Sequence, residues 1–463
     1  MKKLFNPYIL TLSLVFVIIA YTINSCKEKA KEIPPKSDSV SQSTEEKKQL
    51  ILSNLNETLH KDSSNMEVWN KKGILLVTMN RPKEALQCFI KATELNPGVA
   101  ENWYDKGTME NILGNNKYAV ISFDKAISID KFHYKAYYNK GRALDELGKH
   151  QEAINAYDEA IKIYPNYDSA WTNKGISLSV LGNYDDAMKA YDKALEINPK
   201  FGDAYYNKAL LLTVLKKYDE ALTCYYKDVE YNPGNKNAWG NMGNLLSNLG
   251  RYDEAVNAFD KAIALDSANV DYWNNLGIAQ SGKQKFDEAI KDFKKALNLN
   301  PKNDKTWYNL GNTYLNNKNS DDAIVAFKKS IEINPDNDNT WNNLATVYLA
   351  LNKYDEAMNA YSKSLILNPK NKNAWYNRGI GLFREKKYVD AMKCFSNVIN
   401  LNPQDARPYY LRACIYSMTN EKKKALSELG TALKLAPQYK ERLGKDEYFK
   451  NLWDDKNFQK LVR

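Results

Sequence analysis

Apolar residues recur along most of this 463-residue chain with two periods, one inside the other. Within short segments they stand three and four residues apart, which places them on one side of a helix. The segments themselves return every 34 residues, so that residues 307–315 read WYNLGNTYL and residues 341–349 read WNNLATVYL. The pattern predicts an all-α chain built from a long series of paired, short amphipathic helices.

Three positions hold this register through eleven copies. The first is an aromatic residue, which we call the lead aromatic: Trp69, Trp103, Tyr137, Trp171, Tyr205, Trp239, Trp273, Trp307, Trp341, Trp375 and Tyr409. Gly or Ala follows four residues after it, and Ala follows sixteen residues after it. Small residues at these positions allow two helices to approach closely. An aromatic ring one turn after that alanine, such as Phe89 or Phe327, then fills the space between units; only the last copy replaces the ring, with Leu429.

Residues between the helices mark where each helix begins and ends. Gly or Asn at the end of the first helix is expected to adopt a positive φ. Asp or Glu opens the second helix, where free amide groups favour negative charge. Proline closes nine of the eleven copies, because the residue before a proline resists helical geometry.

With these residues in place, the pattern W-x₂-L-G-x₂-Y…A-x₃-F…P resembles the tetratricopeptide-repeat family over residues 66–439, in eleven units of 34 residues. The resemblance implies a solenoid in which each unit packs on its neighbours. It also implies a right-handed superhelix whose concave surface is lined by the first helix of each unit. The ends of such an array need caps, so we expect a capping helix in residues 45–65 and a closing helix in residues 440–463.

The amino-terminal residues do not belong to the repeats. Residues 1–25 combine two lysines, an apolar stretch and a small-residue site, which is the layout of a secretory signal peptide. The stretch INSC at residues 23–26 resembles a bacterial lipobox, and this resemblance implies that Cys26 is lipidated. Residues 26–44, polar and with two prolines, are interpreted as a flexible tether.

These features predict an extracytoplasmic chain attached to a membrane of the cell envelope. Lys27 differs from the retention signal of inner-membrane lipoproteins, so the outer membrane facing the periplasm is favoured. An uncleaved membrane anchor is the alternative, and both interpretations give the same topology.

Two residues after the lead aromatic, eight successive copies carry asparagine. We call these side chains the ladder asparagines: Asn139, Asn173, Asn207, Asn241, Asn275, Asn309, Asn343 and Asn377. In tetratricopeptide-repeat proteins this position faces the concave groove, and the row resembles the asparagine ladder with which O-GlcNAc transferase and importin-type solenoids hold an extended chain. A carboxamide both donates and accepts, so the row could bind peptide N–H and C=O groups of a partner. A second interpretation stays open, in which the amides only bridge adjacent helices.

Charged residues carry a less specific signal. The formal charge of +10, interpreted as spread along the chain, weakly favours acidic partners, and nucleic-acid binding is not expected. Arg142 stands alone in its row, which argues against a carboxylate clamp. Lysines recur beside the ladder and are interpreted as a solvated face: Lys72, Lys106, Lys140, Lys174 and Lys208.

Catalysis is not expected, because the repeats occupy most of the chain and no nucleophile elbow, phosphate-binding loop or zinc-protease motif occurs. Three histidines and five widely spaced cysteines predict neither a metal site nor a cofactor. The sequence favours a non-enzymatic adaptor that binds protein or peptide partners. The alternative is a structural scaffold of the envelope that associates with itself.

Overall fold

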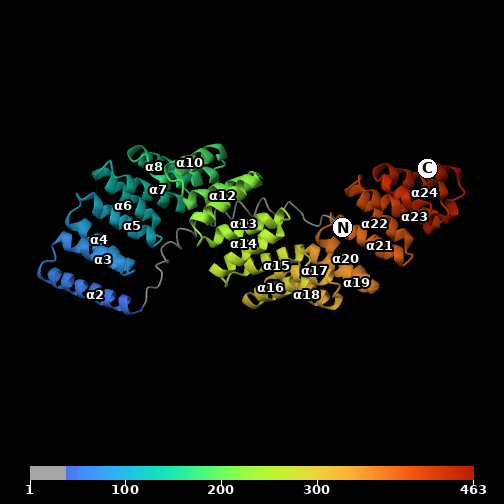
Figure 1. The fold of residues 1–463 in the computed structure, drawn as a ribbon, viewed down its shortest axis with the longest axis horizontal. Helices are drawn as coiled ribbons and strands as arrows, with labels where there is room; N and C mark the ends of the chain where they lie inside the picture. The colour runs from blue at the N-terminus through green and yellow to red at the C-terminus, as the bar shows by residue number, and fades with distance from the viewer. Residues whose placement is uncertain (1–37, 463) are drawn as a thin grey trace. The chain divides into compact units, whose positions relative to one another are not determined.

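The computed structural model describes residues 38–462, with side chains from residue 45 onward. This part of the chain is a succession of helices without strands (Figure 1). The predicted signal peptide, Cys26 and most of the predicted tether lie outside the described residues. Among the described helices, none combines the length and the apolar character needed to span a bilayer.

Twenty-two helices form eleven consecutive pairs, and each pair begins 34 residues after the one before, as the sequence predicts. The first helices are α3 (Met66–Thr78), α5 (Ala100–Ile112), α7 (Tyr134–Glu146), α9 (Asp168–Val180), α11 (Gly202–Val214), α13 (Lys236–Asn248), α15 (Val270–Gly282), α17 (Asp304–Asn316), α19 (Asp338–Ala350), α21 (Lys372–Arg384) and α23 (Ala406–Met418). The second helices are α4 (Pro82–Leu95), α6 (Asn116–Ile129), α8 (His150–Ile163), α10 (Tyr184–Ile197), α12 (Tyr218–Tyr231), α14 (Tyr252–Leu265), α16 (Phe286–Leu299), α18 (Ser320–Ile333), α20 (Tyr354–Leu367), α22 (Tyr388–Leu401) and α24 (Lys422–Leu435). The all-α repeat architecture is confirmed.

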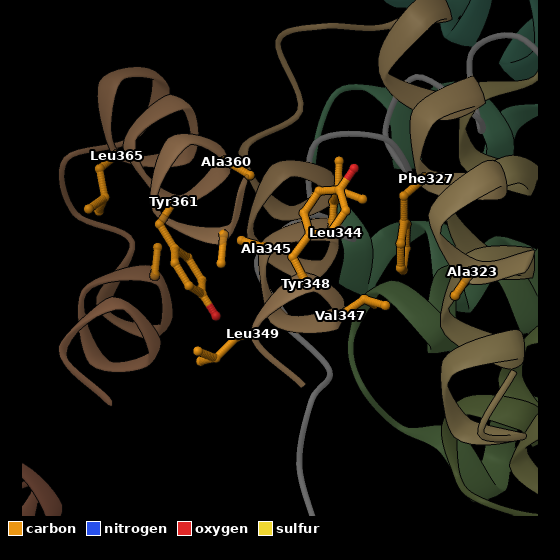
Figure 2. Packing of buried hydrophobic residues seen from close by; sticks show 12 residues of the cluster. Ala323, Phe327, Leu344, Ala345, Val347, Tyr348, Leu349, Ala360, Tyr361 and Leu365 are labelled. Atoms are coloured by element: carbon orange, nitrogen blue, oxygen red, sulfur yellow. The ribbon is translucent and has the colours of Figure 1, made fainter. Parts of the chain in front are cut away.

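The chain divides into two compact units, and the division falls within α13, between Leu245 and Leu246. The core of each unit is a run of small clusters. In the second unit, one cluster joins Phe327 of α18 to Leu344 and Val347 of α19 and to Tyr361 of α20. Figure 2 shows these side chains together, with the alanines of the same helices between the larger groups. The core therefore passes from each repeat into the next.

The small residue of the first helix and the ring of the second helix are in direct contact. A Cβ atom placed on Gly311 would lie 2.7 Å from the nearest ring carbons of Phe327, which is closer than real side chains approach. Phe327 is fully buried. The absence of a side chain at residue 311 therefore sets how closely α17 and α18 pack.

A hydrogen bond that the sequence pattern did not predict joins successive repeats. The indole N–H of each lead tryptophan donates to the carbonyl of the residue six positions earlier, at 2.8 to 3.1 Å. Trp307, for example, donates to the carbonyl of Pro301, 2.9 Å away. The bond fixes the end of one repeat to the first helix of the next, so the aromatic residue contributes a polar contact as well as packing.

Each turn between paired helices contains one residue with positive φ, and these residues also recur every 34 positions. Glycine occupies only four of the eleven turns, and Asn occupies three. Lys or Gln occupies the other four: Lys216, Gln284, Lys318 and Lys386. The expectation of Gly or Asn was therefore incomplete, because the turn geometry imposed by the helix pair outweighs the modest local cost of a left-handed backbone.

The ends of the array differ in detail from the sequence expectation. Helix α2 (Asp38–Lys61) begins inside the segment expected to be a tether, before residue 45. The closing segment is not one helix but three short ones, α25 (Lys440–Leu443), η3 (Glu447–Leu452) and α26 (Lys456–Val462), and η2 (Pro437–Tyr439) directly precedes them. The break after α25 has a local cause, because Gly444 ends that helix and the Asp446 side chain accepts from the amide of Tyr448 to begin η3. Phe449 and Leu452 are fully buried, whereas Trp453 is half-buried.

We expect Gly311→Val to lower the free energy of unfolding by about 1–3 kcal/mol, because the added side chain overlaps the Phe327 ring. Urea unfolding followed by circular dichroism measures this change. Gly430→Ala is the matched control: Gly430 lies inside α24 with open space around it, so this change should stabilise by about 0.5–1 kcal/mol. Equal midpoints for Gly311→Val and the unmodified chain would contradict the packing argument.

Candidate functional site: the ladder asparagines

The ladder asparagines lie on eight successive first helices, α7 to α21, and all eight are half-buried. They follow the lead aromatics, whose side chains pack into the repeats. This placement leaves each carboxamide partly accessible on the side of the first helices that we call the ladder face. The position of every member follows from the 34-residue period.

In five members, the amide nitrogen donates to the residue 35 positions earlier, which directly follows the lead aromatic of the preceding repeat. Four of these acceptors are tyrosine hydroxyls, at 3.1–3.2 Å, and the fifth is the Asn274 side-chain oxygen, 3.1 Å from Asn309. The tyrosine pairs are Asn139 with Tyr104, Asn173 with Tyr138, Asn241 with Tyr206 and Asn343 with Tyr308. The interpretation that the amides bridge adjacent helices therefore describes these five.

The other three ladder asparagines make different bonds. Asn207 donates to the backbone carbonyl of Asp203, four residues earlier on the same helix, at 2.7 Å. Asn377 donates to the Thr346 hydroxyl of the preceding repeat at 3.4 Å. Asn275 accepts from its neighbour Asn274 at 2.9 Å. The row is thus regular in position but not uniform in bonding.

Bridging uses only part of each carboxamide. An asparagine side chain offers two donor hydrogens and one accepting oxygen. For Asn139, Asn173, Asn241 and Asn309, one N–H is used, and no donor among the described residues reaches the oxygen. The inter-helix bond therefore orients the amide and leaves an acceptor for a partner, so bridging and binding can coexist.

Sequence reasoning missed the function of the tyrosines beside the ladder. Tyr138, Tyr206 and Tyr308 accept the amide bonds, which the sequence pattern did not predict. The sequence signal was present, because a residue after one lead aromatic and a residue two places after the next are always 35 apart. Only the packed structure shows that this spacing brings the two side chains into contact.

The lysines beside the ladder are paired rather than merely solvated. Lys140, Lys174 and Lys208 each contact an aspartate on the second helix of the preceding repeat, at 2.5–2.6 Å. The aspartates are Asp124, Asp158 and Asp192. This edge of the first unit is therefore largely neutralised and does not provide an open basic surface.

Asp105 stands at the ladder position of the second repeat, where later copies carry asparagine. Its carboxylate accepts from the Asn70 amide at 3.3 Å. Burial, followed by the negative charge of the nearby Glu101 carboxylate, raises the pKa of Asp105 to about 6, although the Asn70 bond and His133 act in the opposite direction. Glu101 itself contacts His133 at 3.2 Å.

One group of polar side chains in the first unit has the residue types of a hydrolase. Asp145 accepts from the Tyr157 hydroxyl at 2.7 Å and from Ser177 at 2.8 Å, and it contacts His150 at 2.9 Å. Ser177 bonds the carboxylate rather than the imidazole, so no base is placed to activate its hydroxyl. The group links α7, α8 and α9. Across the described residues, no set of side chains with metal-ligand character gathers at one place.

Comparison with models of known protein families identifies the repeats. Tetratricopeptide-repeat models match residues 67–98, 134–167, 169–201, 190–223 and 224–257, and a TPR repeat model matches residues 243–284. The chain belongs to the tetratricopeptide-repeat family. A further model, the C-terminal domain of cilia and flagella-associated protein 70, matches residues 266–445 of this repeat protein. As a tetratricopeptide-repeat protein, it has a protein-binding adaptor role.

No curated protein matches the chain. Among solved structures, MamA is similar at 26% identity over 36% of this chain and 98% of its own, with a TM-score of 0.33. Yeast Tom70 is similar at 17% identity over 83% of this chain and 98% of its own, with a TM-score of 0.40. Pseudomonas aeruginosa pilF is similar at 20% identity over 47% of this chain and 96% of its own, with a TM-score of 0.41.

We expect Asp105→Asn to stabilise this tetratricopeptide-repeat protein at neutral pH, by up to about 2–3 kcal/mol. A carboxyl whose folded pKa is raised binds more protons in the folded state, so the unmodified chain loses stability as the pH rises from about 4 to about 6. Asparagine removes this loss and can still accept from Asn70. Urea midpoints measured at pH 4 and at pH 7.5 test the difference, which should vanish at the lower pH.

Asp336→Asn, at an exposed loop position, is the control for this comparison and should show no such pH dependence. An Asp105→Asn midpoint equal to that of the unmodified chain at pH 7.5 would contradict the assignment of a buried carboxyl.

Proposed function

We propose that this chain is a non-enzymatic adaptor that holds an extended segment of a partner protein along the ladder face. The segment is gripped through its backbone, so its side chains would matter less than its extended conformation. A row of identical amides suits this task, because peptide groups recur along every chain whatever its sequence.

The observation that supports the proposal is the fixed orientation of the amides. The bonds to Tyr104, Tyr138 and Tyr206 hold the nitrogens of Asn139, Asn173 and Asn241 toward the preceding repeat. Each carboxamide is thereby held in one orientation before any partner arrives. An acceptor that is already oriented loses less conformational entropy on binding than a freely rotating one.

We expect the combined change of Asn207, Asn241, Asn275 and Asn309 to alanine to abolish peptide binding. Peptides selected from a random library with the unmodified chain, from residue 45 onward, serve as probes, and fluorescence anisotropy measures their affinity. Backbone N-methylation of the same peptides at alternate residues should also weaken binding, because it removes the N–H groups that the oxygens accept.

The matched control replaces four exposed asparagines of second helices with alanine: Asn155, Asn257, Asn298 and Asn359. Circular dichroism and melting verify that both variants stay folded. Full affinity in the ladder variant, or insensitivity to N-methylation, would refute the proposal and leave the amides as bridges between helices.

We further propose that the adaptor is anchored to a membrane of the cell envelope through a lipid on Cys26, with the repeats on the extracytoplasmic side and the outer membrane as the favoured location. The support is the layout of residues 1–25 and the lipobox-like stretch that ends at Cys26. A lipidated chain of this kind would hold its partner close to the membrane.

We expect Cys26→Ser to move the chain out of the lipid-modified fraction, since the modified sulfur is lost. Metabolic labelling with an alkyne fatty acid and mass measurement of the mature amino terminus give the readout, with Cys88→Ser as the control. Equal labelling of Cys26→Ser and the unmodified chain, or no labelling of either, would refute lipidation at this residue and favour the uncleaved anchor.

A further inference from the structure

The excess of positive charge is not spread evenly, contrary to the expectation from the linear sequence. Residues 372–462 contain 18 Lys and Arg against 10 Asp and Glu, so this stretch has a net charge of +8 while the whole chain has +10. Arginine is concentrated as well, because five of the nine arginines fall between residues 378 and 442. The last two repeats and the closing segment are therefore the basic part of the chain.

Two of these arginines lie against tyrosines that continue the ladder face. Tyr376 and Tyr410 directly follow their lead aromatics, the position that supplies partners for the ladder asparagines. The Arg407 guanidinium lies 4.5 Å from the ring centre of Tyr376. The Arg442 guanidinium lies 4.2 Å from the ring centre of Tyr410 and 4.6 Å from that of Tyr439. We call these five side chains the arginine–tyrosine cluster.

The two stacks lie on successive first helices, α21 and α23. The rings of Tyr410 and Tyr439 are 4.9 Å apart. Burial raises the pKa of Tyr376, and the positive charges of Arg407 and Arg442 oppose that rise. Both arginines are exposed, whereas Tyr376 and Tyr439 are half-buried and Tyr410 is buried. The three tyrosine rings form the less exposed part of the cluster, and the two guanidinium groups belong to its exposed side chains.

Much of the donor capacity of the two arginines is unused. Arg442 makes no ion pair and no side-chain hydrogen bond with any described residue. Arg407 bonds Asp405 through Nε and Nη2, which leaves its Nη1 nitrogen without a partner in the described part of the chain. A guanidinium stacked on a ring keeps its edge N–H groups in the ring plane, where they can meet a carboxylate side by side.

The two nearby carboxylates are already engaged. Asp405 pairs with Arg407 and also accepts from the backbone amide of residue 407, at the start of α23. Asp446 accepts from the Tyr410 hydroxyl and from the amide of Tyr448. The Tyr410 hydroxyl is therefore bonded to Asp446, whereas the corresponding tyrosine of an inner repeat is bonded to a ladder asparagine. Neither acid neutralises Arg442 directly.

We propose that the arginine–tyrosine cluster binds glutamate or aspartate side chains of the partner protein, so that the adaptor selects segments with an acidic stretch at this end of the ladder face. The inference rests on the proposed function, because the acidic residues belong to the segment that the ladder asparagines hold. The ladder supplies affinity without sequence preference, and Arg407 with Arg442 supplies the preference.

The test uses three fluorescein-labelled peptides of equal length, in which Glu, Gln or Lys alternates with Gly. We expect the Glu peptide to bind the chain most tightly and to weaken as salt is added. Arg407→Gln combined with Arg442→Gln should reduce its affinity roughly tenfold or more, since charge-assisted bidentate bonds are lost. Arg442→Gln alone, which breaks no hydrogen bond within the described residues, should produce a smaller loss in the same direction.

Lys422→Gln combined with Lys423→Gln is the matched control, since it removes the same charge from exposed positions on α24. Equal affinities for the Glu and Gln peptides would overturn the inference, and so would an equal loss in the lysine control. If the ladder variant loses peptide binding while the arginine variants keep it, the proposed function stands and this inference falls. If the arginine variants lose peptide binding while the ladder variant keeps it, the arginine–tyrosine cluster binds the acidic residues and the proposed function of the ladder asparagines is refuted.

Discussion

The contact between a small residue and a ring sets the geometry on which every repeat depends. In the first helix, a Cβ atom at Gly73, Gly141 or Gly379 would lie within 2.5–2.7 Å of a ring carbon of the second helix. Ala209, Ala345 and Ala413 occupy the same position in other copies and are fully buried. Because the two helices of a pair are in contact almost at the backbone, the distance between them can vary little. Between neighbouring repeats, side chains 35 positions apart, such as those of Asn139 and Tyr104, come within hydrogen-bonding distance.

The ladder asparagines use this proximity in two ways. Their nitrogens donate to tyrosines such as Tyr104 and Tyr308, or to Asn274, and so tie adjacent first helices together. The same bonds orient the oxygens of Asn139 and Asn173 toward a partner. In a solenoid, where each unit contacts only its neighbours, such ties contribute to stability repeat by repeat. In the proposed function, the structural and binding functions of these amides are therefore linked, and one does not exclude the other.

Electrostatic character differs between the first repeats and the last repeats of the chain. Near the beginning, Asp105 and Glu101 are carboxylates, and the lysines of the next three repeats, Lys140, Lys174 and Lys208, pair with aspartates of the repeats before them. Near the end, Asp446 takes the hydroxyl of Tyr410 in place of an asparagine, and Arg407 and Arg442 cover the tyrosines. In the proposed function, binding of the partner's backbone can thus be combined with local charge preferences. The repeat fixes where side chains lie and leaves their chemistry variable.

The sequence by itself determined the repeat period, the helix pairs, the small residues under the rings and the positions of the ladder asparagines. These features depend on helical spacing and turn chemistry, which are local. The tertiary structure decided the rest: the partners of Asn139 and Asn343, the tryptophan bond to Pro301, the left-handed Lys216, the broken closing segment and the stacking of Arg407 and Arg442 on tyrosines. The asparagine partners and the arginine stacks depend on residues that are far apart in sequence, and Arg442 lies outside the repeat register altogether. Lipidation of Cys26 stays a prediction, because it depends on processing of the amino terminus and not on the packing of the repeats.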